Sequence, residues 1–98
     1  MTGRLHPEAR EEYLEAIAYY ALRRRALAES FIQDVEEGIS AVVEHPTAFP
    51  QVEPGVRRYL IRRFPFGIFY TMEPDGNILV IAVGHLKRQS GYWHSRLT

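Results

Sequence analysis

The chain of 98 residues contains no cysteine. Disulfide bridges, thiolate zinc sites and a cysteine nucleophile are therefore excluded, which fits a reducing compartment. The four histidines, His6, His45, His85 and His94, are separated by distances that match no zinc-binding pattern, so we expect no metal site. With 46% hydrophobic and 24% charged residues, the composition is that of a folded chain whose stability comes from packing.

Long apolar runs are also missing. No stretch approaches the roughly 18 apolar residues that a membrane-spanning helix needs, and residues 1–6 lack the apolar segment of a signal peptide. Glycine-rich phosphate loops and the context of a serine nucleophile are absent as well. We therefore expect a cytoplasmic protein that uses no membrane and no small-molecule cofactor. The length predicts a single domain over residues 1–98.

The formal net charge is zero, but the two halves of the chain differ in sign. Residues 1–50 carry nine acidic and five basic side chains, whereas residues 51–98 carry three acidic and seven basic ones. Lys87 is the only lysine, so the positive charge is almost all arginine. The asymmetry indicates either an anionic partner for the second half or a basic strand edge kept soluble by arginine.

Two amphipathic helices are predicted in the first half. Pro7 suits the first position of a helix, and the glutamates after it and the arginines at 23–25 match the two ends of the helix dipole. A second apolar stripe runs from Leu27 to His45 and stops before Pro46, and the short joint between the helices predicts an antiparallel hairpin. The faces expected to be buried are Tyr13, Leu14, Ile17, Ala18, Ala21 and Leu22 in the first helix, and Leu27, Phe31, Val35, Ile39 and Val42 or Val43 in the second.

The second half changes to β-type composition after a proline- and glycine-containing loop at 47–55. Three segments rich in β-branched and aromatic residues predict strands, namely Val56–Phe64, Phe66–Met72 and Asn77–Leu86. The Pro-Asp-Gly-Asn turn at 74–77 joins the last two as a hairpin, and Gly3–His6 is a possible edge strand. We therefore predict an α+β fold in which an N-terminal α-helical hairpin packs on a three- to four-stranded antiparallel β-sheet.

Four arginines fall in the first of these strands. Because side chains alternate along a strand, Arg58 and Arg62 share one face, and Arg57 and Arg63 share the other. Arginine binds phosphate or carboxylate groups through two parallel hydrogen bonds, which favours a surface for nucleic acid or for an acidic protein. The alternative is that some of them pair with the acidic helices or protect a sheet edge.

A second cluster follows the last strand and comprises His85, Lys87, Arg88, Tyr92 and Trp93. A histidine can transfer protons near neutral pH, an arginine can hold a phosphate, and a tyrosine can stack on a base or donate its hydroxyl. The alternative is that His85 binds a backbone group while Tyr92 and Trp93 anchor the tail in the core. We expect Trp93 to be structural, Arg88 to be functional, and the tail to dock back on the protein.

The acidic residues of the first helix form a weaker candidate. Glu11 and Glu15 stand four residues apart and could act as a pair of carboxylates. Together with Arg10 and Glu12, however, they have the pattern of a solvated face on which like charges are tolerated. We therefore expect all of them to face water.

The order of motifs along nearly the whole chain resembles the RelE/ParE superfamily of toxins from type II toxin–antitoxin modules, and is most similar to its ParE-like, plasmid stabilization branch. The combination of a Phe-Pro-Phe corner with a later His-x-x-Arg and Tyr-Trp is the most specific part. The residues that carry the resemblance are Pro7, Ala9, Glu12, Tyr20, His45-Pro46, Phe49-Pro50, Val56-Arg57, Phe64-Pro65-Phe66, Tyr70, 80–83, His85, Arg88 and Tyr92-Trp93.

The resemblance implies the fold that periodicity predicts, and it implies a cognate antitoxin whose C-terminal segment wraps the toxin and covers the groove between helices and sheet. ParE-like members poison DNA gyrase. RelE-like members cleave mRNA on the ribosome without a metal. In a RelE-like mechanism Arg62 or Arg63 and Arg88 would hold the scissile phosphate, and His85 or Tyr92 would transfer protons.

The leading expectation is a toxin that inhibits DNA gyrase by binding it, since the lysine-rich active surface of typical RelE enzymes is missing here. One alternative is a ribosome-dependent mRNA endoribonuclease with His85, Arg88 and Tyr92 as catalytic residues, and another is a non-toxic module that only binds an antitoxin. ParE-like proteins usually have proline two residues after the tail arginine, where this chain has Ser90. The predicted target- or nucleic-acid-binding residues are Arg58, Arg62, Arg63, Lys87 and Arg88.

Overall fold

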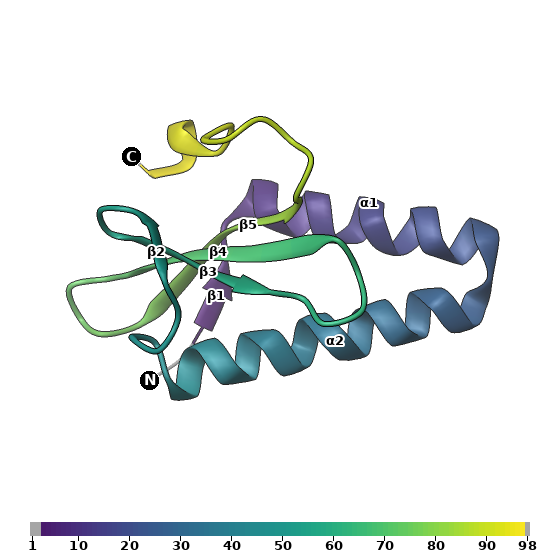
Figure 1. Cartoon of the computed structure of the whole chain (residues 1–98), viewed down its shortest axis with the longest axis horizontal. Coiled ribbons are helices and arrows are strands. Elements are labelled where there is room, and N and C mark those ends of the chain that lie inside the picture. The colour runs from purple at the N-terminus through teal and green to yellow at the C-terminus, as the bar shows by residue number, and fades with distance from the viewer. Residues whose placement is uncertain (1–2, 98) are drawn as a thin grey trace.

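The computed structural model describes residues 3–97, in which two helices, α1 (Pro7–Arg23) and α2 (Arg25–Glu44), form an antiparallel hairpin (Figure 1). α1 begins at Pro7 as predicted. The ring of His6 caps this helix, since it accepts a hydrogen bond from the amide of Glu8 at 3.1 Å. Only Arg24, which is extended at φ −166°, separates the helices, so α2 begins two residues earlier than expected. The joint of the hairpin projects beyond the sheet in Figure 1.

A five-stranded sheet packs against this hairpin, in the order β1-β5-β4-β3-β2. Its strands are β1 (Gly3–Leu5), β2 (Gln51–Glu53), β3 (Val56–Leu60), β4 (Phe66–Met72) and β5 (Ile78–His85). The hairpin of β4 and β5 is confirmed. The sheet is larger than predicted and is not wholly antiparallel, because β1 pairs with β5 in parallel and the segment predicted as a loop contains β2.

The strand predicted to run to Phe64 ends at Leu60 instead. Residues 61–65 make a corner, in which the amide of Ile61 donates to the carbonyl of Phe66 and the amide of Phe66 donates to the carbonyl of Phe64. Pro65 has no amide hydrogen with which to continue a ladder. As a result, Arg62 and Arg63 lie in the corner and not on a strand.

The helices bury one face of the sheet around an aromatic cluster. Phe31 is fully buried, and its ring centroid lies 5.0–5.2 Å from those of Tyr20, Phe64 and Phe66. The stripe predicted on α2 is largely confirmed. The face predicted on α1 is only partly correct: Tyr13 and Ile17 pack against the core as predicted. Leu14 and Leu22 are instead 49% and 89% exposed, and the small residues Ala9 and Ala16 are buried.

Small residues mark the inward side of these helices because the helices lie close to the sheet. At Gly38 of α2, a β-carbon would lie 2.7 Å from Cδ1 of Ile68 and 2.8 Å from Cε1 of Tyr59. Real β-carbons do not approach other atoms so closely, and glycine is therefore required there. Leu22 is exposed because it lies one residue before the end of α1, and this end of the hairpin projects beyond the sheet.

The opposite face of the sheet is covered by the tail. Trp93, 3% exposed, packs with Val56, Ile81 and Ala82, and Phe69 lies 5.5 Å from it between ring centroids. The tail then ends in a short 3-10 helix, His94–Leu97. The prediction that the tail docks back on the protein is confirmed, and the apolar side chains form a cluster on each face of the sheet.

Asp34 of α2 is the buried partner of Arg63. Its side chain is 3% exposed and accepts two hydrogen bonds from the guanidinium, from Nε to Oδ2 at 3.0 Å and from Nη2 to Oδ1 at 2.8 Å. These bonds hold the pKa of Asp34 below its usual value, against the opposing effect of burial. One of the four arginines therefore pairs with the helices, as the structural alternative proposed.

The stability of the protein should depend on this carboxylate in acid. A carboxyl group whose pKa is lowered in the folded state stabilises that state above its unfolded pKa, near about 4, and loses this effect as the pH falls through the folded pKa. We expect Asp34→Asn to be less stable than wild type at neutral pH, with a difference that shrinks below about pH 4. Urea unfolding at a series of pH values measures it, and parallel stability curves would contradict the assignment.

Candidate functional site

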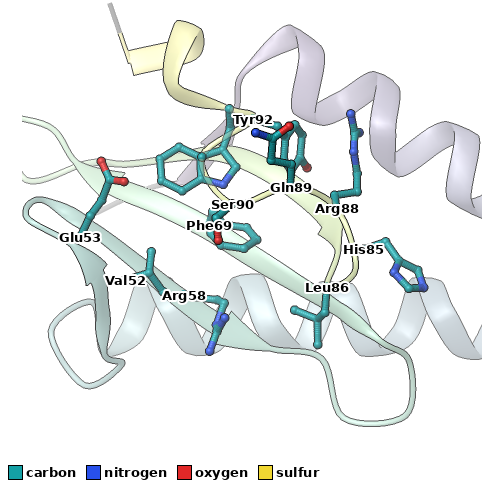
Figure 2. Close-up of a pocket in the computed structure, with 12 residues that line it drawn as sticks. Val52, Glu53, Arg58, Phe69, His85, Leu86, Arg88, Gln89, Ser90 and Tyr92 are labelled. Carbon is teal, nitrogen blue, oxygen red and sulfur yellow. The ribbon is translucent and has the colours of Figure 1, made fainter.

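A pocket of about 130 Å³ lies between the tail and the face of the sheet that the helices leave uncovered (Figure 2). The strands contribute its floor and the first residues after β5 contribute its rim. Its lining includes Glu53, Arg58, Phe69, His85, Arg88 and Trp93. The pocket thus brings together one arginine of the predicted basic strand and the cluster predicted at the end of the last strand.

The rim is shaped by a turn at the end of β5. The amide of Leu86 donates to the carbonyl of Pro65 at 2.9 Å, and the amide of Arg88 donates to the carbonyl of His85 at 3.1 Å. His85 also accepts a hydrogen bond at Nδ1 from the amide of Lys87, at 3.1 Å. These bonds tie the turn to the Phe-Pro-Phe corner and present the side chains of Lys87 and Arg88 at the surface.

Glu12 of α1 lies at the centre of the hydrogen bonds that hold the tail. Its side chain is only 11% exposed. Oε2 accepts from Nη1 of Arg88 at 3.0 Å and from the hydroxyl of Tyr92 at 2.5 Å, while Oε1 accepts from Nη1 of Arg96 at 2.7 Å and from the amide of Val83 at 3.2 Å. The expectation that Glu12 faces water is wrong, because the tail folds over it.

The pair of Glu12 and Arg96 also closes an edge of the sheet. β1 ends at Leu5, and the amide of His6 then donates to the carbonyl of Val80. Beyond Val80, no strand among residues 3–97 pairs with β5 on that side. Arg96 donates to the carbonyl of Ile81 at 3.0 Å, and Glu12 accepts from the amide two residues later. The carbonyl of Ile81 and the amide of Val83 thus make the hydrogen bonds that an added strand would otherwise supply.

Tyr92 lies between two guanidinium groups. The Cζ atom of Arg88 is 3.8 Å from the ring centroid and that of Arg96 is 5.1 Å from it, both within the range of cation–π attraction. Gly84 of β5 makes room for the hydroxyl, because a β-carbon there would lie 2.1 Å from the oxygen of Tyr92. Burial, together with the hydrogen bond to Glu12, raises the pKa of Tyr92 well above its ordinary value, so the hydroxyl stays protonated.

The arginines predicted on one strand have separate environments. Arg57 donates to the carbonyl of Phe49 at 2.6 Å and holds the segment after α2, and Arg63 is bound to Asp34. Arg62 is exposed in the corner and does not line the tail pocket. Of the predicted binding residues, the structure therefore brings together Arg58, Lys87 and Arg88 near the tail pocket, but not Arg62 and Arg63.

Arg58 is the cation on the floor of the pocket. Its Cγ and Cδ atoms pass 3.2 Å from the position of a β-carbon at Gly67, so the stem crosses β4, and its Nε atom is buried with no hydrogen-bond partner among residues 3–97. In Figure 2 the side chain of Arg58 points away from that of Arg88, which extends towards α1. The two guanidinium groups therefore do not converge on a single point.

His85 lines both the tail pocket and a second pocket beside α1, which Ala16 and Tyr19 also line. Its ring packs edge-on against Phe66 at 5.2 Å between centroids, and the bond from the amide of Lys87 engages Nδ1. In the neutral form this leaves the proton on Nε2. The alternative in which His85 binds a backbone group is confirmed, and the ring keeps one nitrogen free of that bond.

Glu12 and Arg96 are the residues that sequence reasoning missed. Glu12 stands three residues after Ala9 and four before Ala16, and those two alanines mark the side of α1 that faces the sheet. Spacing relative to the small residues could therefore have found it. Arg96 carries no comparable signal, since the segment that positions it is a turn and a 3-10 helix without a long-range period.

Two kinds of feature are absent from residues 3–97. Within residues 3–97, no helix is long and apolar enough to cross a membrane. In the same segment, no three or more histidine, aspartate or glutamate side chains come close enough together to hold a metal ion. The polar side chains that line the tail pocket are Glu53, Arg58, His85, Arg88, Gln89, Ser90 and Tyr92.

Comparison with known proteins gives one family. The family described as "ParE toxin of type II toxin-antitoxin system, parDE" matches residues 4–90. Among solved structures, one titled "Chromosomal ParDE TA system from P. aeruginosa" is similar with a TM-score of 0.73 and 20% sequence identity, over 87% of this chain and 95% of that chain. No curated protein sequence matches.

Proposed function

We propose that this chain, which belongs to the ParE toxin family of type II toxin–antitoxin systems, inhibits DNA gyrase by binding it through the tail site. The tail site comprises Arg58, Lys87, Arg88 and Tyr92. Membership of such a system implies an antitoxin as partner. Gyrase as target, and the cytoplasm as the compartment in which it is met, follow from the behaviour expected of ParE-like members.

The observation that carries the choice of binding over RNA cleavage is the engagement of Tyr92 and Arg88 by Glu12. Cleavage by an attacking 2′-hydroxyl needs a base, an acid and a cation directed at one phosphate. Here the hydroxyl of Tyr92 has a raised pKa and donates to a carboxylate, and the two guanidinium groups of the pocket do not converge. A fixed cationic surface of this kind supports recognition of a macromolecule.

The half-exposed state of Arg88 suits it for contact with a target. Its side chain is 51% exposed although one guanidinium nitrogen binds Glu12 and its Cζ atom lies 3.8 Å from the ring centroid of Tyr92. Arginine held against an aromatic ring loses little further freedom when it binds, and arginine and tyrosine are frequent among the residues that dominate interface affinity. Lys87, exposed on the same turn, adds charge at the rim.

Expression in a bacterial host without an antitoxin tests the proposal. We expect growth arrest with filamentation and a DNA-damage response, and the purified protein should inhibit supercoiling of relaxed plasmid by purified gyrase. Rapid loss of mRNA by cleavage inside translated codons would instead identify a ribosome-dependent endoribonuclease. Growth without arrest, at a protein level verified by immunoblotting, would contradict both toxin activities and favour the alternative of a non-toxic module that only binds an antitoxin.

A further inference from the structure

We propose that Glu12 is the positioning residue of the tail site, which holds Arg88 and Tyr92 in the arrangement that meets the target. The proposal rests on the proposed function for the identity of that target. Glu12 belongs to the first helix, and the residues that it binds follow the last strand, so no local interaction places them. The carboxylate thus connects the helical hairpin to the tail, beside a longer ion pair of 3.9 Å between Glu8 and Arg96.

The first argument is the completeness of the contacts to this carboxylate. An ionised carboxylate has about four acceptor positions on its two oxygens. Glu12 uses all four, for Arg88, Tyr92, Arg96 and the amide of Val83. A group that accepts only two of these donors would leave the others unsatisfied in a site where Glu12 is 11% exposed.

The second argument is that other contacts of the tail hold different atoms. Trp93 fixes the chain against the sheet through apolar packing, and His94 binds Glu53 of β2 at 2.7 Å. Neither contact orients the guanidinium of Arg88. The orientation comes from Glu12 on one side and the ring of Tyr92 on the other, and the ring is itself held by its hydroxyl bond to Glu12.

The consequence for binding is pre-organisation. A long side chain that is already immobilised loses less conformational entropy in a complex, an effect of roughly two- to tenfold in affinity for each such side chain. Arg88 and Tyr92 together should therefore contribute roughly a tenfold change in affinity through their positioning by Glu12. Glu12 itself need not contact the target for this effect.

Two variants test the proposal in different ways. Glu12→Gln keeps the size of the side chain but replaces one acceptor oxygen with an NH2 donor, which faces donors on either side. Gly84→Ala keeps Glu12 and displaces the hydroxyl of Tyr92 by steric contact. Trp93 is the only tryptophan in the chain and lies beside Tyr92, so its fluorescence reports the position of the tail.

We expect both variants to show stronger acrylamide quenching and a red-shifted emission of Trp93, and to inhibit gyrase roughly tenfold more weakly than wild type. Combined with Arg88→Ala, Glu12→Gln should add less to the loss than it costs alone, because residues that act through one another are not additive and only the positioning of Tyr92 is then left to lose. Tyr70→Phe is the control. It removes a buried bond of 2.7 Å to the carbonyl of Pro46 on the helix face, so it should lower Tm while leaving quenching and inhibition unchanged.

The outcomes separate the two proposals. Wild-type inhibition with unchanged Trp93 quenching in folded Glu12→Gln would overturn the role of Glu12, and so would losses of inhibition that add fully to those of Arg88→Ala. If the wild-type protein fails to inhibit gyrase, the proposed function fails. In that case the quenching of Trp93 in Glu12→Gln and Gly84→Ala alone decides whether Glu12 holds the tail.

Discussion

Replacing Phe31 with alanine is expected to destabilise the protein by about 3–5 kcal/mol. Phe31 is fully buried where α1, α2 and the Phe-Pro-Phe corner meet, and its ring contacts the rings of Tyr20, Phe64 and Phe66. Its removal loses both the transfer free energy of the ring and the packing of three aromatic neighbours around a cavity. A domain of this size has a total stability of about 5–15 kcal/mol, so the loss is a large fraction of the whole.

Urea denaturation followed by circular dichroism measures this effect, and Tyr19→Ala provides the matched control. Tyr19 is also an aromatic residue of the hairpin and packs edge-on against Tyr20 at 5.3 Å, but it is 52% exposed. We expect the control to cost less than about 1 kcal/mol. Equal losses for the two variants would mean that the cluster around Phe31 is not the centre of the helix-side core.

Replacing Arg88 with alanine is expected to weaken gyrase inhibition by roughly 30- to 1000-fold, corresponding to an interface residue worth about 2–4 kcal/mol. The fold should survive, because Glu12 keeps Arg96, Tyr92 and the amide of Val83 as donors and the Arg88 side chain is half exposed. The concentration of protein that halves gyrase supercoiling measures the effect, with the midpoint of thermal unfolding recorded alongside.

Arg25→Ala is the control for the loss of one positive charge. Arg25 lies at the start of α2, its side chain is 91% exposed, and its 3.8 Å pair with Glu29 is a surface ion pair that contributes little. Inhibition by this variant should match that of wild type. Full inhibition by Arg88→Ala would remove Arg88 from the target surface, and an equal loss in Arg25→Ala would show that only net charge matters.

The positive charge of the second half of the chain proves to have several uses. Arg57 and Arg63 bind groups within the protein, which is the structural alternative that the sequence left open. Arg58, Lys87 and Arg88 lie near the tail pocket, where Arg88 also binds Glu12, and an anionic partner for them stays a prediction.

The sequence by itself determined what local interactions control. Pro7 and the histidine before Pro46 bound the helices, and the Pro-Asp-Gly-Asn turn predicts the β4–β5 hairpin, because each depends on the conformations open to a few adjacent residues. The cluster of His85, Arg88 and Tyr92 could also be predicted, since all three lie within one short segment of the chain.

Only the tertiary structure decided which groups meet across long separations. The parallel pairing of β1 with β5 and the bonds from Glu12 to the tail join residues about 70–85 positions apart. The burial of Ala9 in place of Leu14 depends on how closely the helices approach the sheet. Periodicity identifies the apolar face of a helix from its large hydrophobic side chains. A helix that lies close to a sheet buries small residues instead, as α1 does with Ala9 and Ala16. A glutamate that looks solvated on an isolated helix can therefore become the residue on which the tail is fixed.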